Sequence, residues 1–335
     1  MAGFTEQELV SALRTILSED VAGVRLGLGD DAALVDPGSH LTVLTADLLV
    51  EGVHFHRETT SPHDLGYKSL AVNVSDVAAM GGSPRYALVS LGIPESVEMA
   101  WVVELYAGLR DAASEYAMTI VGGDTSRSDP ILISVAVTGE VAEGLAVTRS
   151  GARPGDRVVV TGALGAAAGG LRLASAPKVD VAAVSSRSGR ELLTAYARPQ
   201  ARVGEGQTLA REGATAMIDV SDGLVVDLGH VCRESRVGAS IVLADVPVAP
   251  ALAELGTALG ADPLELALGG GEDYELLATL PPRAVPLTQQ LLTDRFGTTL
   301  TDIGEIRTEE GMVAVEADGS ERPLEAQGWD HFART

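Results

Sequence analysis

The sequence predicts an α/β (α+β) protein built from two domains of similar organisation. Segments with the composition of strands alternate with helical segments, and each half carries loops rich in glycine and aspartate. A length of 335 residues is typical of two domains of ordinary size. Hydrophobic residues make up 46% of the chain and aromatic ones 4%, so we expect a core mostly of Ala, Val, Leu and Ile.

The first half is predicted to begin with an amphipathic helix over residues 4–19. Residues 61–82 are predicted to form a longer helix that has Ser61 as its N-cap and ends at Gly81. The other elements expected in this half are strands over 40–47, 86–93, 118–123 and 131–141 and a helix over 96–117.

A stretch rich in Gly, Pro and Arg, residues 148–156 (TRSGARPGD), is predicted to join a domain over 1–147 to a domain over 148–335. The second domain is expected to continue the alternation, and the residues after 280 are not assigned to individual elements. Its strands are expected over 157–162, 214–220, 239–244 and 273–280, and its helices from Ala163 and over 187–197, 202–212, 222–235 and 250–258.

The chain is strongly acidic, with 47 acidic against 24 basic residues and a net charge of −23. This balance argues against nucleic acid or an anionic membrane surface as the main partner, because both require a basic surface. No apolar run is long enough to span a bilayer and the N-terminus lacks the layout of a signal peptide, so we expect a cytoplasmic protein. The single cysteine, Cys232, excludes an internal disulfide.

Two adjacent aspartates, Asp30 and Asp31, follow a Gly-x-Gly turn in GLGDDA. The spacing formally satisfies a dinucleotide-binding fingerprint, but two bare carboxylates would repel a pyrophosphate, and Pro37 breaks the helix that should follow. A plain acidic turn and a metal site remain equally good interpretations of this loop.

The helix over 61–82 carries a polar stripe on an otherwise apolar sequence. Ser69, Asn73 and Asp76 lie at i, i+4 and i+7 and so share one face. A stripe exposed to solvent would more often use longer charged residues, so a functional role for this stripe is favoured about two to one. A buried carboxylate there would need a partner or a cation.

Further acidic residues follow expected strands or glycine-rich turns. They are Asp47 at the end of a strand, Asp124 after a Gly-Gly pair, Asp219 and Asp222 in IDVSDGL, and Glu272 in GGGEDYEL. Asp222 could instead cap the helix that follows it. Hard oxygen ligands of this kind suit Mg²⁺ bound together with substrate phosphates. The chain has no P-loop, and Lys68 is expected mid-helix, so phosphoryl chemistry would depend on metals and arginines.

The histidines give a weaker signal. His54 and His56 form a His-x-His pair, but too few later histidines follow to support a zinc hydrolase. For His54 alone, a loop histidine with satisfied hydrogen bonds and a binding role are equally good interpretations.

Eight motifs in order along nearly the whole chain carry a family resemblance. They are GDDAA, TADLLVEGVHF, LAVNVSDVAAMGGSP, VGGDTSRS, RSGARPGD, IDVSDGL, GGGEDYEL and GWDHF. The set resembles the thiamine-monophosphate kinase family, within the superfamily of aminoimidazole-ribonucleotide synthetase, selenophosphate synthetase and the hydrogenase maturation protein HypE.

The resemblance implies a two-domain PurM-like fold, in which the N-terminal domains of a homodimer form a barrel and the C-terminal domain is α/β. It implies an active site between the domains and ATP-dependent phosphorylation of thiamine monophosphate to thiamine diphosphate. Mg²⁺ and ATP are the implied cofactor and co-substrate.

The resemblance also implies roles for individual residues. The magnesium-linked residues would be Asp30, Thr45, Asp47, Asp76, Asp124, Asp219 and Asp222, and Ala46 could ligate only through its backbone carbonyl. ATP would be bound by Tyr106, Gly123, Asp124, Arg149 and Ser221, and the thiamine moiety by His54, Glu272 and Trp329. Asp47, Asp124 and Arg149 would act in catalysis.

The chemistry of such a reaction fits the residues. A substrate phosphate has a second pKa near 6, so it is largely ionised at neutral pH and needs no strong base. Catalysis would consist of in-line positioning and of charge neutralisation by Mg²⁺ and Arg149. The nearest alternative is a sibling enzyme that phosphorylates a carbonyl or amide oxygen. A non-enzymatic cation-binding module is less favoured because its ligands would lie close together in sequence.

Overall fold

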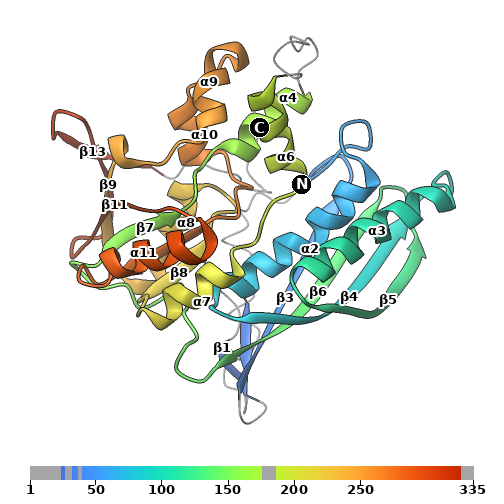
Figure 1. The fold of residues 1–335 in the computed structure, drawn as a ribbon, viewed down its shortest axis with the longest axis horizontal. Coiled ribbons are helices and arrows are strands. Elements are labelled where there is room, and N and C mark those ends of the chain that lie inside the picture. Colours follow the sequence, from blue (N-terminus) through green and yellow to red (C-terminus); the bar gives the residue numbers. More distant parts are fainter. Residues whose placement is uncertain (1–23, 27–31, 37–39, 176–185, 326–335) are drawn as a thin grey trace, which may run out of the picture.

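The computed structural model describes residues 24–26, 32–36, 40–175 and 186–325. Within these residues the chain forms two sheets, each with its own helices, and helix α2 (Pro62–Ala79) lies where the two halves meet (Figure 1). The expectation of two α/β domains is therefore confirmed. The helix predicted over 4–19 lies outside the described residues, and so do Asp30 and Trp329.

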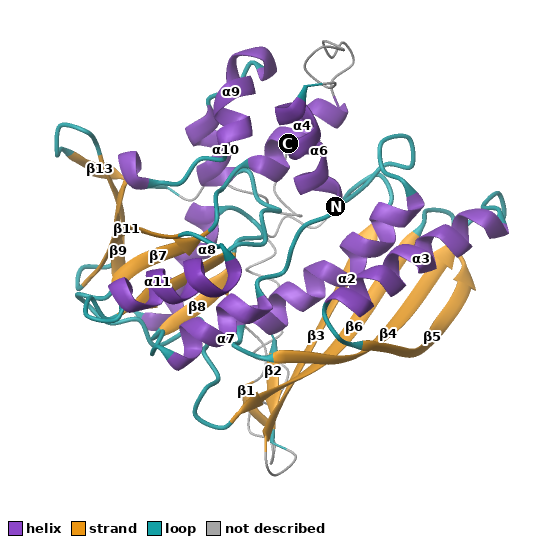
Figure 2. Ribbon diagram, in the orientation of Figure 1, coloured by secondary structure: helices purple, strands orange, loops and turns teal. Residues whose placement is uncertain are grey.

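The N-terminal sheet has six strands in the order β1-β2-β3-β6-β4-β5. They are β1 (Val24–Leu26), β2 (Ala33–Val35), β3 (His40–Val50), β4 (Ser83–Ile93), β5 (Thr119–Arg127) and β6 (Leu132–Ala142). All pairs are antiparallel except β4 with β5. Helices α2 and α3 (Met99–Glu115) cover one face of this sheet, and no helix of the described residues covers the other face (Figure 2).

Two strands run further than their sequences predicted. Pairing of β3 with β6 continues to Val50, and pairing of β5 with β4 continues to Arg127. Asp47 and Asp124 therefore lie inside strands and not at strand ends. The backbone ladder extends each strand past the glycines and acidic residues that suggested an earlier end, because it satisfies the hydrogen bonds of those residues too.

The C-terminal sheet has seven strands in the order β13-β12-β9-β11-β7-β10-β8. They are β7 (Arg157–Thr161), β8 (Ala216–Asp219), β9 (Gly238–Val242), β10 (Leu276–Leu280), β11 (Leu300–Arg307), β12 (Gly311–Val315) and β13 (Glu321–Pro323). The helices are α4 (Ala166–Ser175), α6 (Arg187–Ala197), α7 (Val203–Arg211), α8 (Leu224–Ser235), α9 (Pro250–Leu259), α10 (Pro263–Gly269) and α11 (Val285–Phe296), with a 3₁₀ turn η1 (Leu243–Asp245).

The C-terminal sheet has a hydrophobic core on each face. Side chains of α7 and α11 pack on one face, and side chains of α8 pack on the other. Helices α4, α6 and α9 form a separate apolar cluster. Among the described helices, none combines the length and the apolar character required to cross a bilayer.

Helix α2 is buried on nearly all sides because both domains pack against it. Ser61 caps it by accepting a hydrogen bond from the backbone N–H of Asp64, as predicted. After its last residue the chain turns at Gly81, whose φ is +70°. The helix packs on α3 and β3 of the N-terminal domain and on α7 and β8 of the C-terminal domain. These contacts therefore fix the position of the two domains relative to each other.

Glycines allow α2 and α3 to cross at close range. A Cβ on Gly108 would lie 1.8 Å from the carbonyl oxygen of His63, and one on Gly66 would lie 1.9 Å from the carbonyl oxygen of Leu105. The neighbouring atoms are backbone, so they cannot move aside as a flexible side chain could.

We predict that Gly108→Ala lowers the free energy of unfolding by about 2–3 kcal/mol, because the added methyl group forces the two helix backbones apart. Urea unfolding followed by circular dichroism would measure this. Gly229→Ala is the matched control: it also lies in a helix, α8, and its Cβ would lie at an ordinary 3.4 Å from Met312. A Gly108 variant as stable as this control would contradict the close crossing.

Candidate active site

A cavity of about 520 Å³ lies between the two domains. Its walls come from β3 and the following loop, from α2, from the loop between β8 and α8, and from the loop before β10. Most of the residues singled out in the sequence line it: Thr45, Ala46, Asp47, His54, Asp76, Arg149, Asp219, Ser221, Asp222 and Glu272.

The polar stripe of α2 is buried and connects the helix to β3. Ser69 and Asn73 are fully buried, so a stripe facing solvent is excluded. Asn73 accepts a hydrogen bond from the backbone N–H of Asp47 at 3.0 Å, and Thr45 Oγ1 donates to Asp76 Oδ2 at 2.5 Å. These contacts fix Thr45, Asp47 and Asp76 relative to one another on the helix-covered face of the sheet.

A second buried contact joins α2 to the other domain. Ser75 Oγ donates a hydrogen bond to Asp219 Oδ2 at 2.6 Å, and both side chains are buried. No local sequence pattern indicates Ser75, because its partner lies 144 residues away. The bond brings Asp219 to the cluster formed by Asp47 and Asp76.

The loop after β8 is held by Asp227, a residue of α8 that is 1% exposed. Its Oδ2 accepts hydrogen bonds from the backbone N–H groups of Ser221, Asp222 and Gly223 at 3.1, 3.2 and 3.1 Å. Gly223 is the N-cap position of α8, and no side chain caps the helix there. Asp222 is thus not the helix cap, and its side chain lines the cavity.

Asp222, Asp227 and His230 also have one potential ligand atom each within 4.8 Å of the others. Asp227 already serves as an acceptor for three backbone N–H groups, which explains its position without a metal.

The loop before β10 has an unusual backbone. Gly271, Glu272 and Tyr274 have φ values of +67°, +59° and +52°, so the strand predicted from 273 begins only at Leu276. A non-glycine residue in this region costs about 1–2 kcal/mol. The loop is held by hydrogen bonds from the N–H of Glu272 to Ser221 O at 2.7 Å and from the N–H of Tyr274 to Val220 O. Strain of this kind is typical of functional loops.

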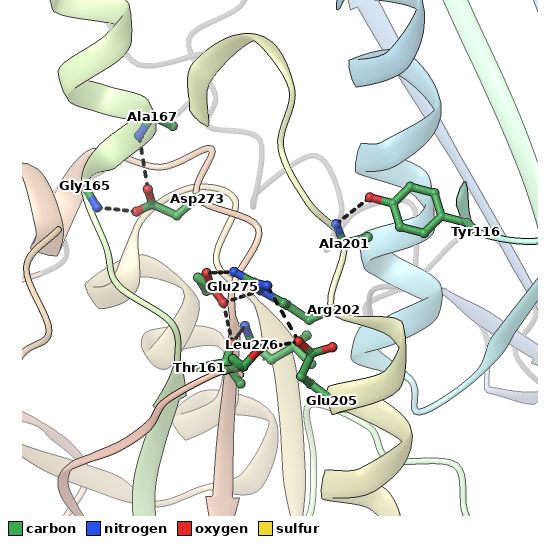
Figure 3. Close-up of polar contacts among 11 residues, drawn as sticks. Tyr116, Thr161, Gly165, Ala167, Ala201, Arg202, Glu205, Asp273, Glu275 and Leu276 are labelled. Carbon is green, nitrogen blue, oxygen red and sulfur yellow. Dashed lines mark hydrogen bonds and ion pairs between the residues drawn. The ribbon is translucent and has the colours of Figure 1, made fainter. Parts of the chain in front are cut away.

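A network of polar contacts joins the end of this loop to β7, to the start of α4 and to the segment before α7 (Figure 3). Glu275 accepts hydrogen bonds from Thr161 Oγ1 at 2.6 Å and from Arg202 Nε at 2.8 Å. Asp273 accepts from the N–H groups of Gly165 at 2.7 Å and Ala167 at 3.3 Å, at the start of α4. Acceptors at a helix N-terminus satisfy N–H groups that have no partner within the helix.

Acidic side chains concentrate around Tyr274. Burial raises the pKa of its hydroxyl well above 10, and the charges of Glu272, Asp47, Asp219 and Asp76 raise it further. Four carboxylates close to one another repel unless a cation lies among them. The donor set is entirely hard oxygen, which fits Mg²⁺ better than zinc or copper.

His54 is a loop histidine with a satisfied hydrogen bond, and its binding role stays a prediction. Its Nδ1 accepts a hydrogen bond from the backbone N–H of Val50 at 3.0 Å, which places the proton on Nε2. The same side chain lines the cavity.

Three of the expected ATP-binding residues lie away from the cavity. Gly123 and Asp124 are on β5, the edge strand, and Tyr106 is on α3. Strand β5 is three strands away from β3, which corresponds to about 14 Å.

The strand register also separates Asp124 from Asp47 by face. Asp124 is level with Ser90, Ser134 and Leu48, whereas Asp47 is level with Val135 and Val89. Residues level with one another in neighbouring strands share a face. Asp124 therefore lies on the face without helices, and Asp47 on the face toward α2.

Lys68 is a further residue of the cavity, although its expected mid-helix position gave it no role in phosphoryl chemistry. It is buried in α2, lines the cavity and lies 2.8 Å from Glu272 Oε1. One signal was available: Lys68 is one of only two lysines in a chain whose other basic residues are arginines.

Comparison with known proteins accounts for this architecture. The chain matches the family of AIR synthase related proteins, with the N-terminal domain over residues 29–141 and the C-terminal domain over 153–316. It is 39% identical to the thiamine-monophosphate kinase of Escherichia coli strain K12 over 312 residues, which cover 92% of this chain and 93% of that protein. The chain belongs to the thiamine-monophosphate kinase family.

Solved structures of this family have the same two-domain PurM-like fold. AaThiL complexed with AMPPCP and TMP is 36% identical, with a TM-score of 0.84 that covers 98% of this chain and 97% of that one. The thiamine-monophosphate kinase of Stenotrophomonas maltophilia K279a is 37% identical, with a TM-score of 0.77 over 96% of this chain and 98% of that one.

The partly buried carboxyl group of Asp273 predicts a pH dependence of stability. Burial raises its pKa from 3.8 to about 7 against the opposing effect of its two backbone N–H donors, and the charges of Glu275 and Glu272 add to the rise. Because the folded protein holds this proton more tightly than the unfolded chain, the contribution of Asp273 is fully present below pH 3.8 and is lost as the pH rises through about 7.

We therefore expect wild type to lose stability relative to Asp273→Asn between about pH 4 and pH 7, with no further loss at higher pH. Urea unfolding of both proteins at several pH values would measure the difference. A difference that does not change with pH would show that Asp273 titrates normally.

Proposed function

We propose that this chain transfers the γ-phosphoryl group of ATP to thiamine monophosphate, which gives thiamine diphosphate and ADP. The observation that carries the proposal is the cluster of Asp47, Asp76 and Asp219 in the interdomain cavity of a chain of this family. The AaThiL structure that covers 98% of this chain holds AMPPCP and TMP, a nucleotide and a phosphate ester that both need their charge neutralised.

The metal-binding residues in the cavity would be Thr45, Asp47, Asp76, Asp219 and Asp222. Magnesium, when bound, would neutralise the phosphates of both substrates and hold them in line. The side chain of Ala46 lies level with Ala136, on the face away from Asp47, so Ala46 could ligate only through its carbonyl oxygen. The Thr45 hydroxyl and the Asn73 amide keep the carboxylates in place before either substrate binds.

The phosphoryl transfer itself needs little from the side chains beyond charge and position. A phosphate oxygen of thiamine monophosphate attacks the γ-phosphorus of ATP, the bond to the β–γ bridging oxygen breaks, and ADP leaves with that electron pair. Arg149 lines the cavity and supplies positive charge to the transferred group. The loop of Ser221 and Asp222, fixed by Asp227, would contact the nucleotide. Glu272 and the Nε2–H of His54 would contact the thiamine moiety.

We predict that purified protein with ATP, Mg²⁺ and thiamine monophosphate forms ADP and thiamine diphosphate in equal amounts. Asp47→Asn removes a carboxylate from the cation cluster and should lower kcat by roughly 100-fold or more. Chromatographic quantification of both products would measure this. Asp318→Asn, in an exposed turn outside the site, is the matched control and should retain full activity. Absence of thiamine diphosphate with wild type would refute the proposed reaction.

A homodimer would complete the site. Leu44, Leu48, Tyr86 and Leu88 form an apolar patch on the helix-free face of the N-terminal sheet, and each is between 39% and 54% exposed. Edge strand β5 has no partner on its outer side in the described residues, and β2 covers β3 only as far as Leu44. A second copy would cover this face and add its β5 beside β3, so that the two sheets close into a barrel.

This arrangement would bring the partner's Gly123 and Asp124 to the cavity of the first copy. It accounts for the separation of the expected ATP-binding residues within one chain, where β5 lies three strands away from β3.

We expect an Asp47→Asn chain co-expressed with an Asp124→Asn chain to regain activity, because in a mixed dimer one site receives a normal Asp47 and a normal Asp124. Half of the dimers are mixed and half of their sites are intact, so about a quarter of wild-type activity should return. Purified homodimers of each variant, assayed separately and mixed without exchange, are the control. No recovery in verified mixed dimers would place both aspartates in the same chain's site.

Leu88→Glu should also convert the dimer to a monomer in light scattering.

A further inference from the structure

Lys68 has an environment that neither its helix nor the apolar core explains. Its side chain is 3% exposed, and its ammonium nitrogen lies 2.8 Å from Glu272 Oε1 and 4.2 Å from the centre of the Tyr196 ring. The angles of the pair are not those of a hydrogen bond, so the ammonium has no hydrogen-bond acceptor among the described residues. Burying an ammonium group in this way is costly and needs a compensating role.

The three groups come from both domains. Lys68 is in α2, whereas Tyr196 is in α6 and Glu272 is in the loop before β10. The contact therefore forms only when the two domains lie together around the cavity.

The charge of Lys68 matters most for Glu272. Glu272, Asp47, Asp76 and Asp219 all act on the hydroxyl of Tyr274, so Glu272 belongs to the same negatively charged region. Without a cation beside it, the Glu272 carboxylate would be repelled by the other three. The pair with Lys68 engages Oε1, and the side chain of Glu272 is 28% exposed toward the cavity that it lines.

We propose that Lys68 is a positioning residue that holds Glu272 away from the metal-binding carboxylates and directs its second oxygen to the organic, cationic part of the phosphate ester. The proposal rests on the function proposed above and adds a residue to it. Lys68 thereby separates two tasks of the acidic region: the aspartates gather the metal and the phosphates, and Glu272 selects the substrate. The substrate class is a phosphate ester with a positively charged heteroaromatic group.

The test is a double-mutant cycle of Lys68→Met and Glu272→Gln, read as KM for each substrate. Lys68→Met should raise KM for thiamine monophosphate about tenfold and leave KM for ATP within about twofold. Glu272→Gln should do the same. Because Lys68 acts through Glu272, the double variant should be no worse than the poorer single variant.

Val74→Ala controls for simple destabilisation of α2. Val74 is fully buried in the same helix, and its truncation should lower Tm without changing the ratio of the two KM values. If Lys68→Met does not fold, the cycle is repeated with Lys68→Gln, which keeps a donor without the charge.

Two results would overturn the inference. They are equal rises in both KM values for the Lys68 variant, and a double variant whose effect is the product of the single effects. With an active wild type, either result refutes only the role of Lys68. A wild type that neither phosphorylates nor binds thiamine monophosphate would refute the proposed function, and the role of Lys68 with it.

Discussion

The burial of helix α2 between the two domains is the constraint on which the site depends. In a helix packed on all sides, each polar side chain left without a partner would cost about 1–3 kcal/mol. Its polar residues therefore meet partners in both directions: Asn73 holds the backbone of Asp47, and Ser75 holds Asp219 of the other domain. Domain packing and assembly of the carboxylate cluster are consequently the same event.

The concentration of negative charge in the cavity makes folding less favourable. Asp47, Asp76, Asp219 and Glu272 all act on Tyr274, and Glu272 and Tyr274 have left-handed backbone angles. Repulsion and strain both destabilise the folded chain, and they persist because hydrogen bonds to Ser221 and Val220 hold the loop. A ligand that binds only the folded protein stabilises it by mass action, so a cation that binds among these carboxylates would offset part of this repulsion.

One face of the N-terminal sheet is not covered by the described residues of a single chain. Its α2 face is a packed core, whereas its other face exposes Leu48, Tyr86 and Leu88. Exposed apolar side chains gathered on one sheet face are typical of an interface, and here they lie near strand β5, whose outer side has no partner strand among the described residues. The residues expected to bind ATP are divided between this region and the cavity, which is the division that a shared site would produce.

The sequence by itself determined the elements and the chemistry. Strand-like composition predicted β3, β4 and β6, Ser61 predicted the start of α2, and the family motifs identified the acidic residues that line the cavity. Only the tertiary structure decided which of these residues meet. Strand pairing placed Asp47 and Asp124 on opposite faces, and domain packing joined Ser75 to Asp219 and Lys68 to Glu272. Such pairs are far apart in the chain, so no local pattern specifies them, and their energy is gained only when both domains are folded.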